Sequence, residues 1–297
     1  MTKKAFIFPG QGNRPQGLID YIAEQGEPSQ LKPLCSVLGV ESISQLRELA
    51  DEVLDNNIHS SLLTVVSSII AYQKHQQHLG KPDFVSGYSI GQWTALYVAG
   101  CLSYEQLLEV VVARATFMND AIDASPSGMI TVMGIGEPDV KAVVAQLNTG
   151  DSCCYLSNYN CFGNYSIAFS NDIKSEVIEA FRAAGASKVV ELSVAGGWHS
   201  PILASAEQQF KDYIAKVDLM SPKIPVINNV TGQWLPGGRE ALIRQLAQHI
   251  SHAVCWEQGV ISMIDKGATE FIELGHGKML CKFGFFISRD VTFKAAS

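Results

Sequence analysis

Residues 85–93 read Val85-Ser86-Gly87-Tyr88-Ser89-Ile90-Gly91-Gln92-Trp93, a Gly-x-Ser-x-Gly motif. A short run at 83–85 precedes it, and the mostly apolar residues 94–99 that follow end at Gly100, which predicts a strand, a tight turn and a buried helix. The glycines permit a sharp bend with the serine at its apex, and the N–H groups that open the helix face whatever the serine attacks. Ser89 is therefore the predicted nucleophile.

The bulk composition limits the classes of protein to which the chain can belong. With 297 residues, 47% of them hydrophobic, it suits one large domain or a domain with an insertion. No secretion signal is recognisable after Met1, and no apolar run is long enough to cross a bilayer, so we expect a cytoplasmic protein with no membrane partner. A net charge of −7 argues against nucleic acid as the main partner. The seven cysteines contain no Cys-x-x-Cys pair, so neither a disulfide framework nor a zinc site is indicated.

Two other local patterns resemble ligand-binding motifs. The glycine-rich loop at 9–14 follows an apolar strand, but it lacks the third glycine and the Gly-Lys-Ser/Thr of nucleotide loops. We expect instead that its glycines let the backbone approach the active site, so that the N–H of Gln11 faces a ligand oxygen. His75 and His78 have a spacing that suits a metal, but no third ligand is near, and a solvated helix end is favoured.

Arg114 and His199 are the next candidates for the site. Arg114 lies at the edge of the buried face of a helix predicted over 103–123, where a guanidinium requires a carboxylate from the protein or from a ligand. The spacing alone favours a structural ion pair. His199 stands in a small-residue loop between a strand and the Ser200-Pro201 helix start, as a general base would, although a structural loop histidine is an equal alternative.

The segment 126–192 differs from its surroundings in its pattern of predicted strands and helices. Strand and helix patterns follow in the order strand, helix, strand, strand, helix, strand over 129–192, which is the split βαββαβ unit of a ferredoxin-like fold. The segment therefore reads as an insertion into a domain formed by 1–125 and 193–297. Residues 42–50 and 60–79 are predicted helices, 224–232 and 271–274 predicted strands, and 278–294 a locally basic tail.

Taken together, separate segments resemble the malonyl-CoA:acyl-carrier-protein transacylases, relatives of the acyltransferase domains of fatty-acid and polyketide synthases. The segments occur in the family's order: 8–12, the motif at 87–91, Arg114, Asn158-Tyr159-Asn160, His199-Ser200, 229–232, 254–256 and 273–275. The resemblance covers nearly the whole chain. It implies an α/β-hydrolase-like core with a parallel sheet and an inserted ferredoxin-like subdomain, with the active site between them.

The resemblance also implies a mechanism and a set of residue roles. Ser89 would carry the acyl group, with His199 as its base. Malonyl-CoA would be the substrate and an acyl carrier protein the acceptor, so coenzyme A would enter as part of the substrate and no bound cofactor is expected. Arg114 would hold the malonyl carboxylate. Given the resemblance, this role is favoured over the structural ion pair. The remaining roles are backbone N–H groups of Gln11 and Ile90 for the oxyanion, a backbone carbonyl near Asn228 and Asn229 to orient the histidine, and an acyl pocket with Tyr88, Trp198 and Asn160.

Two departures from the family pattern leave alternatives open. Tyr88 stands where the family usually has His, and Gln92 where it usually has Glu. The Gly-Tyr-Ser turn is similar to that of the transacylase subunit of malonate decarboxylase. The trans-acting polyketide synthase acyltransferases are the second subfamily that the chain resembles. A thioester hydrolase on the same serine and histidine, a transacylase for another carboxylated acyl group and a non-catalytic docking subunit are the other hypotheses. We expect Lys278 and Lys282 of the basic tail to meet the carrier, against the alternative of an ordinary solvated tail.

Overall fold

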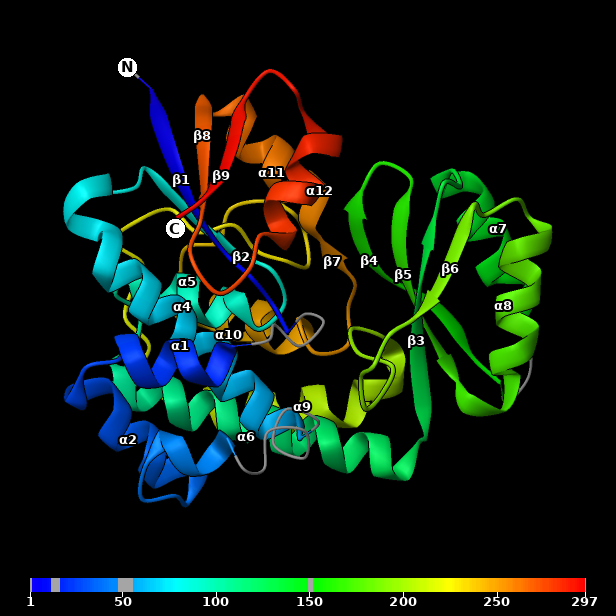
Figure 1. Ribbon diagram of the computed structural model, residues 1–297. Helices are drawn as coiled ribbons and strands as arrows, with labels where there is room; N and C mark the ends of the chain where they lie inside the picture. Colours follow the sequence, from blue (N-terminus) through cyan, green and yellow to red (C-terminus); the bar gives the residue numbers. More distant parts are fainter. Residues whose placement is uncertain (1, 12–16, 48–55, 149–151, 297) are drawn as a thin grey trace.

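The computed structural model describes residues 2–11, 17–47, 56–148 and 152–296, which form a mixed α/β protein with two sheets (Figure 1). This confirms the mixed α/β class expected from the sequence. The strands are β1 (Lys3–Phe8), β2 (Phe84–Gly87), β3 (Ser127–Met133), β4 (Cys154–Cys161), β5 (Asn164–Ser170), β6 (Lys188–Glu191), β7 (Val254–Cys255), β8 (Ala268–Glu273) and β9 (Thr292–Ala295). The α-helices are α1 (Leu18–Gln25), α2 (Pro28–Leu38), α4 (Asn57–Leu79), α5 (Gly91–Val98), α6 (Tyr104–Ala124), α7 (Glu137–Leu147), α8 (Lys174–Ala183), α9 (Ala204–Ile214), α10 (Arg239–Gln248), α11 (Trp256–Asp265) and α12 (Met279–Ile287). Short 3-10 helices are η1 (Ile43–Arg47), η2 (Asn171–Ile173) and η3 (Pro201–Leu203).

The first sheet has the strand order β2-β1-β8-β9, and all its neighbouring strands are parallel. Phe6 and Phe8 of β1 belong to one hydrophobic cluster, whereas Ala5 and Ile7 belong to another. Successive side chains of a strand point to opposite faces, so both faces of this sheet are covered, and the strand reads as a continuous apolar run. Phe8 pairs with Gly87, which brings the loop after β1 beside the turn that carries Ser89.

The second sheet has the order β6-β3-β5-β4-β7. The first four strands pair antiparallel, and β7 pairs parallel with β4. Helices α7 and α8 lie along one face of this sheet, on the side away from the first sheet (Figure 1). Strand β7 comes from a later part of the chain, so the sheet extends beyond the segment 126–192 that the sequence marks as an insertion.

Two expected elements differ from those observed. The predicted strand over 224–232 makes only isolated bridges, between Val85 and Val226 and between Ile227 and Trp234. Pro225 lacks an N–H and cannot continue a ladder on both sides. The helix expected over 42–50 is the 3-10 helix η1, and its last residues lie outside the described part of the chain.

The C-terminal segment is ordered rather than a simple solvated tail. It forms α12 and then β9, the edge strand beside β8. The carboxylate of Glu273, which is fully buried, accepts hydrogen bonds from the backbone N–H groups of Leu280 (3.1 Å) and Cys281 (2.8 Å). An acidic group at the first turn of a helix satisfies donors that have no partner within the helix. Glu273 therefore ties the end of β8 to the start of α12.

Candidate active site

The turn between β2 and α5 holds Ser89 in the left-handed region, with φ of 52°. A side chain at Gly87 would lie 1.9 Å from the backbone of Gly91, and one at Gly91 would lie 2.3 Å from the carbonyl oxygen of Phe8. Both positions therefore exclude any residue but glycine. The strained conformation of a serine is characteristic of a functional turn, because it raises the side chain above the sheet.

Ser89 and His199 meet at this turn although they are 110 residues apart. Ser89 Oγ lies 2.7 Å from His199 Nε2, and His199 Nδ1 lies 2.8 Å from the carbonyl oxygen of His249. A carbonyl only accepts hydrogen bonds, so Nδ1 carries the proton and Nε2 has a free lone pair directed at the serine hydroxyl. This is the tautomer that a general base needs.

The expected source of the histidine-orienting carbonyl was wrong. The carbonyls of Asn228 and Asn229 accept hydrogen bonds from the N–H groups of Gly232 (2.9 Å) and Cys255 (2.7 Å), and the carbonyl that meets His199 belongs to His249. Every residue has a backbone carbonyl, so no sequence pattern distinguishes the one that the fold brings to the imidazole.

Asn229 holds the serine turn instead. Its Oδ1 accepts the N–H of Ser89 (2.8 Å), and its Nδ2 donates to the carbonyl of Gly87 (2.7 Å). The backbone N–H of Asn229 donates to Oε1 of Gln92, which is fully buried (2.8 Å). An amide can replace a carboxylate as this acceptor, so the Gln92 departure from the family pattern leaves the connection intact. Asn228 shapes the same loop by accepting the N–H of Val230 at its Oδ1 (2.9 Å).

Arg114 projects from α6 into the interior and is 2% exposed. Neither Nε nor Nη2 has a hydrogen-bond partner, and within the described residues no carboxylate pairs with the guanidinium. The structural ion pair that spacing favoured is therefore absent from this part of the chain. Burial lowers the pKa of Arg114 to about 10, so the group remains a cation at neutral pH. A buried cation with free donors is a site for an anionic ligand group.

The charge of Arg114 acts on the imidazole of His199. Burial first, and then this positive charge, lower the pKa of His199 to about 3, while its hydrogen bond to the His249 carbonyl acts in the opposite direction. His199 is thus neutral at pH 7 and available to accept a proton. A carboxylate that paired with Arg114 would remove part of the repulsion that opposes protonation.

Gln11 and Ile90 are the residues expected to supply backbone N–H groups to an oxyanion. Ile90 follows Ser89 and immediately precedes α5. A side chain at Gly10 would come within 2.7 Å of the Tyr88 carbonyl, so the loop after β1 passes directly against the serine turn. The side chain of Gln11 donates to Ser60 Oγ (2.7 Å) and Ser61 Oγ (2.8 Å) of α4, which fixes the end of this loop. The expected donation of their backbone N–H groups to an oxyanion stays a prediction.

Tyr88 joins the serine turn to the second sheet. Its hydroxyl donates to Oδ1 of Asn160 on β4 (2.6 Å), and Asn160 Nδ2 donates in turn to Ser166 Oγ (3.2 Å) and Asn164 Oδ1 (3.0 Å). Trp198 is buried in the main core, directly before His199, and its expected part in an acyl pocket stays a prediction.

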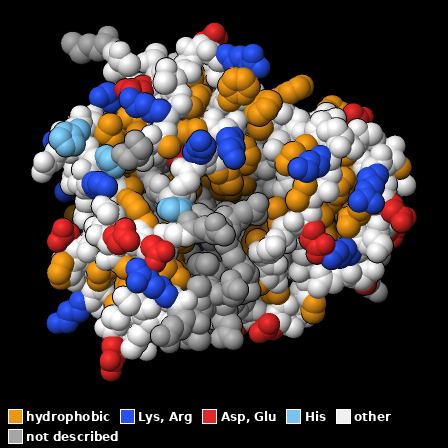
Figure 2. Space-filling model, in the orientation of Figure 1, with side chains coloured by type: hydrophobic (Ala, Val, Ile, Leu, Met, Phe, Trp, Pro, Cys, Tyr) orange, Lys and Arg blue, Asp and Glu red, His pale blue; other side chains and the backbone are white. Residues whose placement is uncertain are grey.

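A cavity of about 510 Å³ lies between the two sheets. The space-filling view has a hollow in the middle of this face, with hydrophobic side chains and Lys or Arg side chains at its rim (Figure 2). Both Tyr88 and Asn160 line the cavity, as do Gln11, Lys278 and Lys282. The basic pair of the C-terminal segment therefore lines the same cavity as Tyr88 and Asn160. Lys294, by contrast, lies on β9 and pairs with Glu270.

Two further findings bear on cofactors and membranes. Within residues 2–11, 17–47, 56–148 and 152–296, no three His, Cys, Asp or Glu side chains gather in a way that could hold a metal ion. The helices of the same residues include none with the length and apolar character needed to cross a membrane.

Comparison with known proteins identifies the family of the chain. Residues 42–282 match the acyl transferase domain. The chain is similar to the malonyl CoA-acyl carrier protein transacylases of Bacillus subtilis (27% identity, covering 94% of this chain and 89% of that protein) and of Staphylococcus aureus strain MRSA252 (28%, covering 98% and 94%). Among solved structures, an acyl-carrier-protein S-malonyltransferase from Burkholderia pseudomallei 1710b is similar, with a TM-score of 0.91 and 28% identity over 99% of this chain and 96% of that one.

Proposed function

The chain belongs to the acyl transferase domain family, and from that premise we propose that it moves a malonyl group from malonyl-CoA to the phosphopantetheine thiol of an acyl carrier protein. The observation that carries this proposal is the buried cation of Arg114 beside the Ser89–His199 pair, because its Nε and Nη2 have no partner among the described residues. A malonyl group has a thioester at one end and a free carboxylate at the other. The pair would react with the first and the cation would hold the second.

In the first half-reaction, Ser89 Oγ forms a bond to the thioester carbonyl carbon while its proton passes to His199 Nε2. The carbonyl oxygen becomes an oxyanion, which the backbone N–H groups of Ile90 and Gln11 would stabilise. The carbon–sulfur bond then breaks, and the departing CoA sulfur takes the proton from His199. Malonate remains as an ester on the serine.

The second half-reaction reverses these steps with a new thiol. The phosphopantetheine thiol of the carrier gives its proton to His199, and its sulfur attacks the malonyl ester. The carbon–oxygen bond breaks and Ser89 recovers the proton. The transfer needs no bound cofactor, because the CoA thioester supplies the activated acyl group. Lys278 and Lys282, which line the cavity, would meet the carrier or the phosphate of its arm.

We assign the two sheets to two parts of one catalytic unit. Residues 1–125 and 193–297 would form the α/β-hydrolase-like core, and 126–192 a ferredoxin-like subdomain. The order β6-β3-β5-β4 supports the second assignment, because its two outer strands are the last and the second of the inserted segment. The Tyr88–Asn160 hydrogen bond would then hold the subdomain at a fixed distance from the nucleophile.

Intact-protein mass spectrometry tests the transfer. We expect malonyl-CoA to add one malonyl mass to the wild-type protein and none to Ser89→Ala, and a phosphopantetheinylated carrier to remove it. Carriers of fatty-acid synthesis, polyketide synthesis and malonate decarboxylase are the acceptors to compare. Faster release of free malonate than transfer to any carrier would favour the hydrolase hypothesis. Absence of an adduct in the wild type would leave only a docking role.

A further inference from the structure

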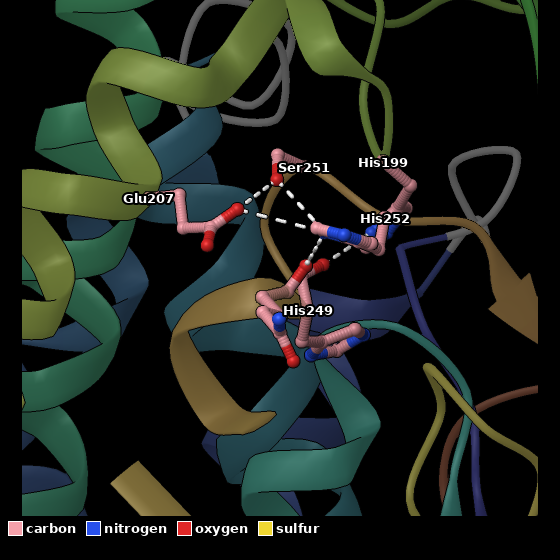
Figure 3. A network of polar contacts seen from close by, with 6 residues as sticks. His199, Glu207, His249, Ser251 and His252 are labelled. Carbon is pink, nitrogen blue, oxygen red and sulfur yellow. Dashed lines mark hydrogen bonds and ion pairs between the residues drawn. The ribbon is translucent and has the colours of Figure 1, made fainter. Parts of the chain in front are cut away.

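His249 lies directly after α10 and is fully buried. Its ring is stacked on that of His199, with centroids 5.0 Å apart and planes inclined by 22°. In Figure 3 a dashed line joins the backbone carbonyl of His249 to the imidazole of His199. His249 thus contacts His199 twice, once through its backbone and once through the face of its ring.

The ring of His249 is held by its face and not by its nitrogen atoms. Neither Nδ1 nor Nε2 has a hydrogen-bond partner among the described residues. A polar ring that is buried without hydrogen bonds costs stability, so a hydrophobic side chain would be cheaper at this position. Burial, and then the charges of His199 and Arg114, lower the pKa of His249 well below its usual value, which keeps the ring neutral at pH 7. The ring is therefore an uncharged aromatic surface against His199.

The aromatic face of His249 can stabilise a charge that forms on His199 during the proposed reaction. His199 becomes an imidazolium each time it takes a proton from Ser89 or from a thiol. In serine–histidine–aspartate triads, a carboxylate stabilises that cation. Here Nδ1 faces only a carbonyl oxygen, and the positive charge of Arg114 opposes the cation. An aromatic face at stacking distance attracts a cation and also fixes the plane of the ring.

We propose that His249 is a positioning residue, whose stacked neutral ring holds the imidazole of His199 in plane and stabilises the imidazolium formed in both half-reactions. The proposal rests on the role of His199 as the base in the proposed function. It concerns the base alone, so it applies equally to every acyl donor. The carboxylate of the substrate and its partner Arg114 are not involved.

The surrounding loop allows the ring to be tested apart from the carbonyl. Glu207 of α9 contacts the hydroxyl of Ser251, and its Oε2 lies 3.5 Å from Nδ1 of His252 (Figure 3). His252 Nδ1 is also 3.1 Å from the carbonyl of Gln248. These contacts hold the loop on both sides of residue 249, so we expect a substitution there to leave the backbone carbonyl in place.

The test compares His249→Leu, which removes the aromatic face, with the matched variant His249→Phe, which restores it. A fluorophosphonate probe reports the reactivity of Ser89 towards a reagent that needs the base but carries no carboxylate. We expect His249→Leu to lower both the labelling rate and kcat for malonyl transfer by roughly 3- to 30-fold with KM unchanged. His249→Phe is expected to recover both to within about threefold of the wild type. Thermal melting checks that each variant is folded, and His249→Met replaces the leucine variant if that one melts early.

Three outcomes would overturn the proposal: equal rates in the leucine variant and the wild type, equal losses in the leucine and phenylalanine variants when both are folded, or a loss confined to KM. A wild-type protein that is labelled by the fluorophosphonate but transfers no malonyl group would refute the proposed function instead. In that case the labelling rates still decide the role of His249.

Discussion

Replacing Arg114 with methionine is expected to stabilise the free protein and at the same time to abolish its preference for carboxylated acyl groups. The guanidinium is 2% exposed, and in the part of the chain that the structure describes its Nε and Nη2 lack partners. Folding therefore removes water from the cation without replacing the lost hydrogen bonds at these two atoms. Methionine fills a similar length of buried space without a charge. The two expected effects have opposite signs, which separates a ligand-binding arginine from a structural one.

The size of the stabilisation follows from the lowered pKa. Burial takes the pKa of Arg114 from 12.5 to about 10, a shift equivalent to about 3 kcal/mol. The group is protonated at pH 7 in both the folded and the unfolded chain, so the full penalty applies there, and it disappears only as the pH rises above about 10. We therefore expect Arg114→Met to gain up to about 3 kcal/mol at pH 7, or roughly 5 °C in Tm for a chain of this length.

The loss of selectivity follows from the two free donors. A malonyl carboxylate that accepts hydrogen bonds from Nε and Nη2 gains about 1.5–3 kcal/mol from each, because both bonds are charge-assisted. The ratio of kcat/KM for malonyl-CoA to that for acetyl-CoA is thus expected to fall by about 10²- to 10⁴-fold in Arg114→Met. Arg182→Met, at an exposed position of α8, is the matched control and is expected to change neither quantity.

Thermal melting and acylation kinetics on the same protein samples test the role of Arg114. A lower Tm for Arg114→Met would mean that the arginine has a stabilising partner in the native protein. Unchanged preference for malonyl-CoA would mean that another group recognises the carboxylate. Either result would refute the role given to Arg114.

Three further predictions concern the base, the serine turn and the link between the sheets. Burial and the charge of Arg114 lower the pKa of His199 to about 3, so below about pH 6.5 the unfolded chain takes up a proton that the folded chain does not. Urea denaturation is therefore expected to show that the wild type loses about 2 kcal/mol more stability than His199→Gln between pH 7 and 5. An acylation rate that fell with an apparent pKa near 6.5 would contradict a neutral base. Gln92→Leu removes the acceptor of the Asn229 N–H and is expected to slow acylation about tenfold, whereas Gln92→Glu keeps an acceptor and is expected to keep the rate. Equal acylation rates for Gln92→Leu and the wild type in stopped-flow assays would show that this hydrogen bond is not needed for the reaction. Tyr88→Phe leaves Oδ1 of Asn160 without its donor and is expected to cost about 1–2 kcal/mol in the free energy of unfolding, a loss that urea titration would detect or exclude.

The turn that carries Ser89 could be predicted from the sequence because its determinants are local. Gly87 and Gly91 stand two residues from the serine on either side, and the close contacts at both positions explain why glycine is required. The apolar runs before and after the turn likewise reflect the burial of β2 and α5. Local spacing and burial were enough to predict where the serine stands.

The partners of the turn could not be predicted in the same way. Asn229 reaches it from 140 residues away, and the carbonyl of His249 reaches His199 from 50 residues away. Strand β7 joins a sheet formed mostly by another part of the chain. Strand β9 pairs with the free edge of β8 and so becomes the edge strand of the first sheet. Each of these contacts depends on where the sheets place distant segments, and a backbone donor or acceptor has no signature of its own in the sequence.

The amino-acid sequence by itself determined the mixed α/β class and the position of the serine turn, because hydrophobic periodicity and glycine placement act over a few residues. Only the tertiary structure decided which carbonyl orients His199, that Arg114 lacks a protein partner in the described part of the chain, and that a second imidazole lies on the first. These features arise from packing between segments far apart in the chain, where burial sets the energetic weight of each charge and each hydrogen bond.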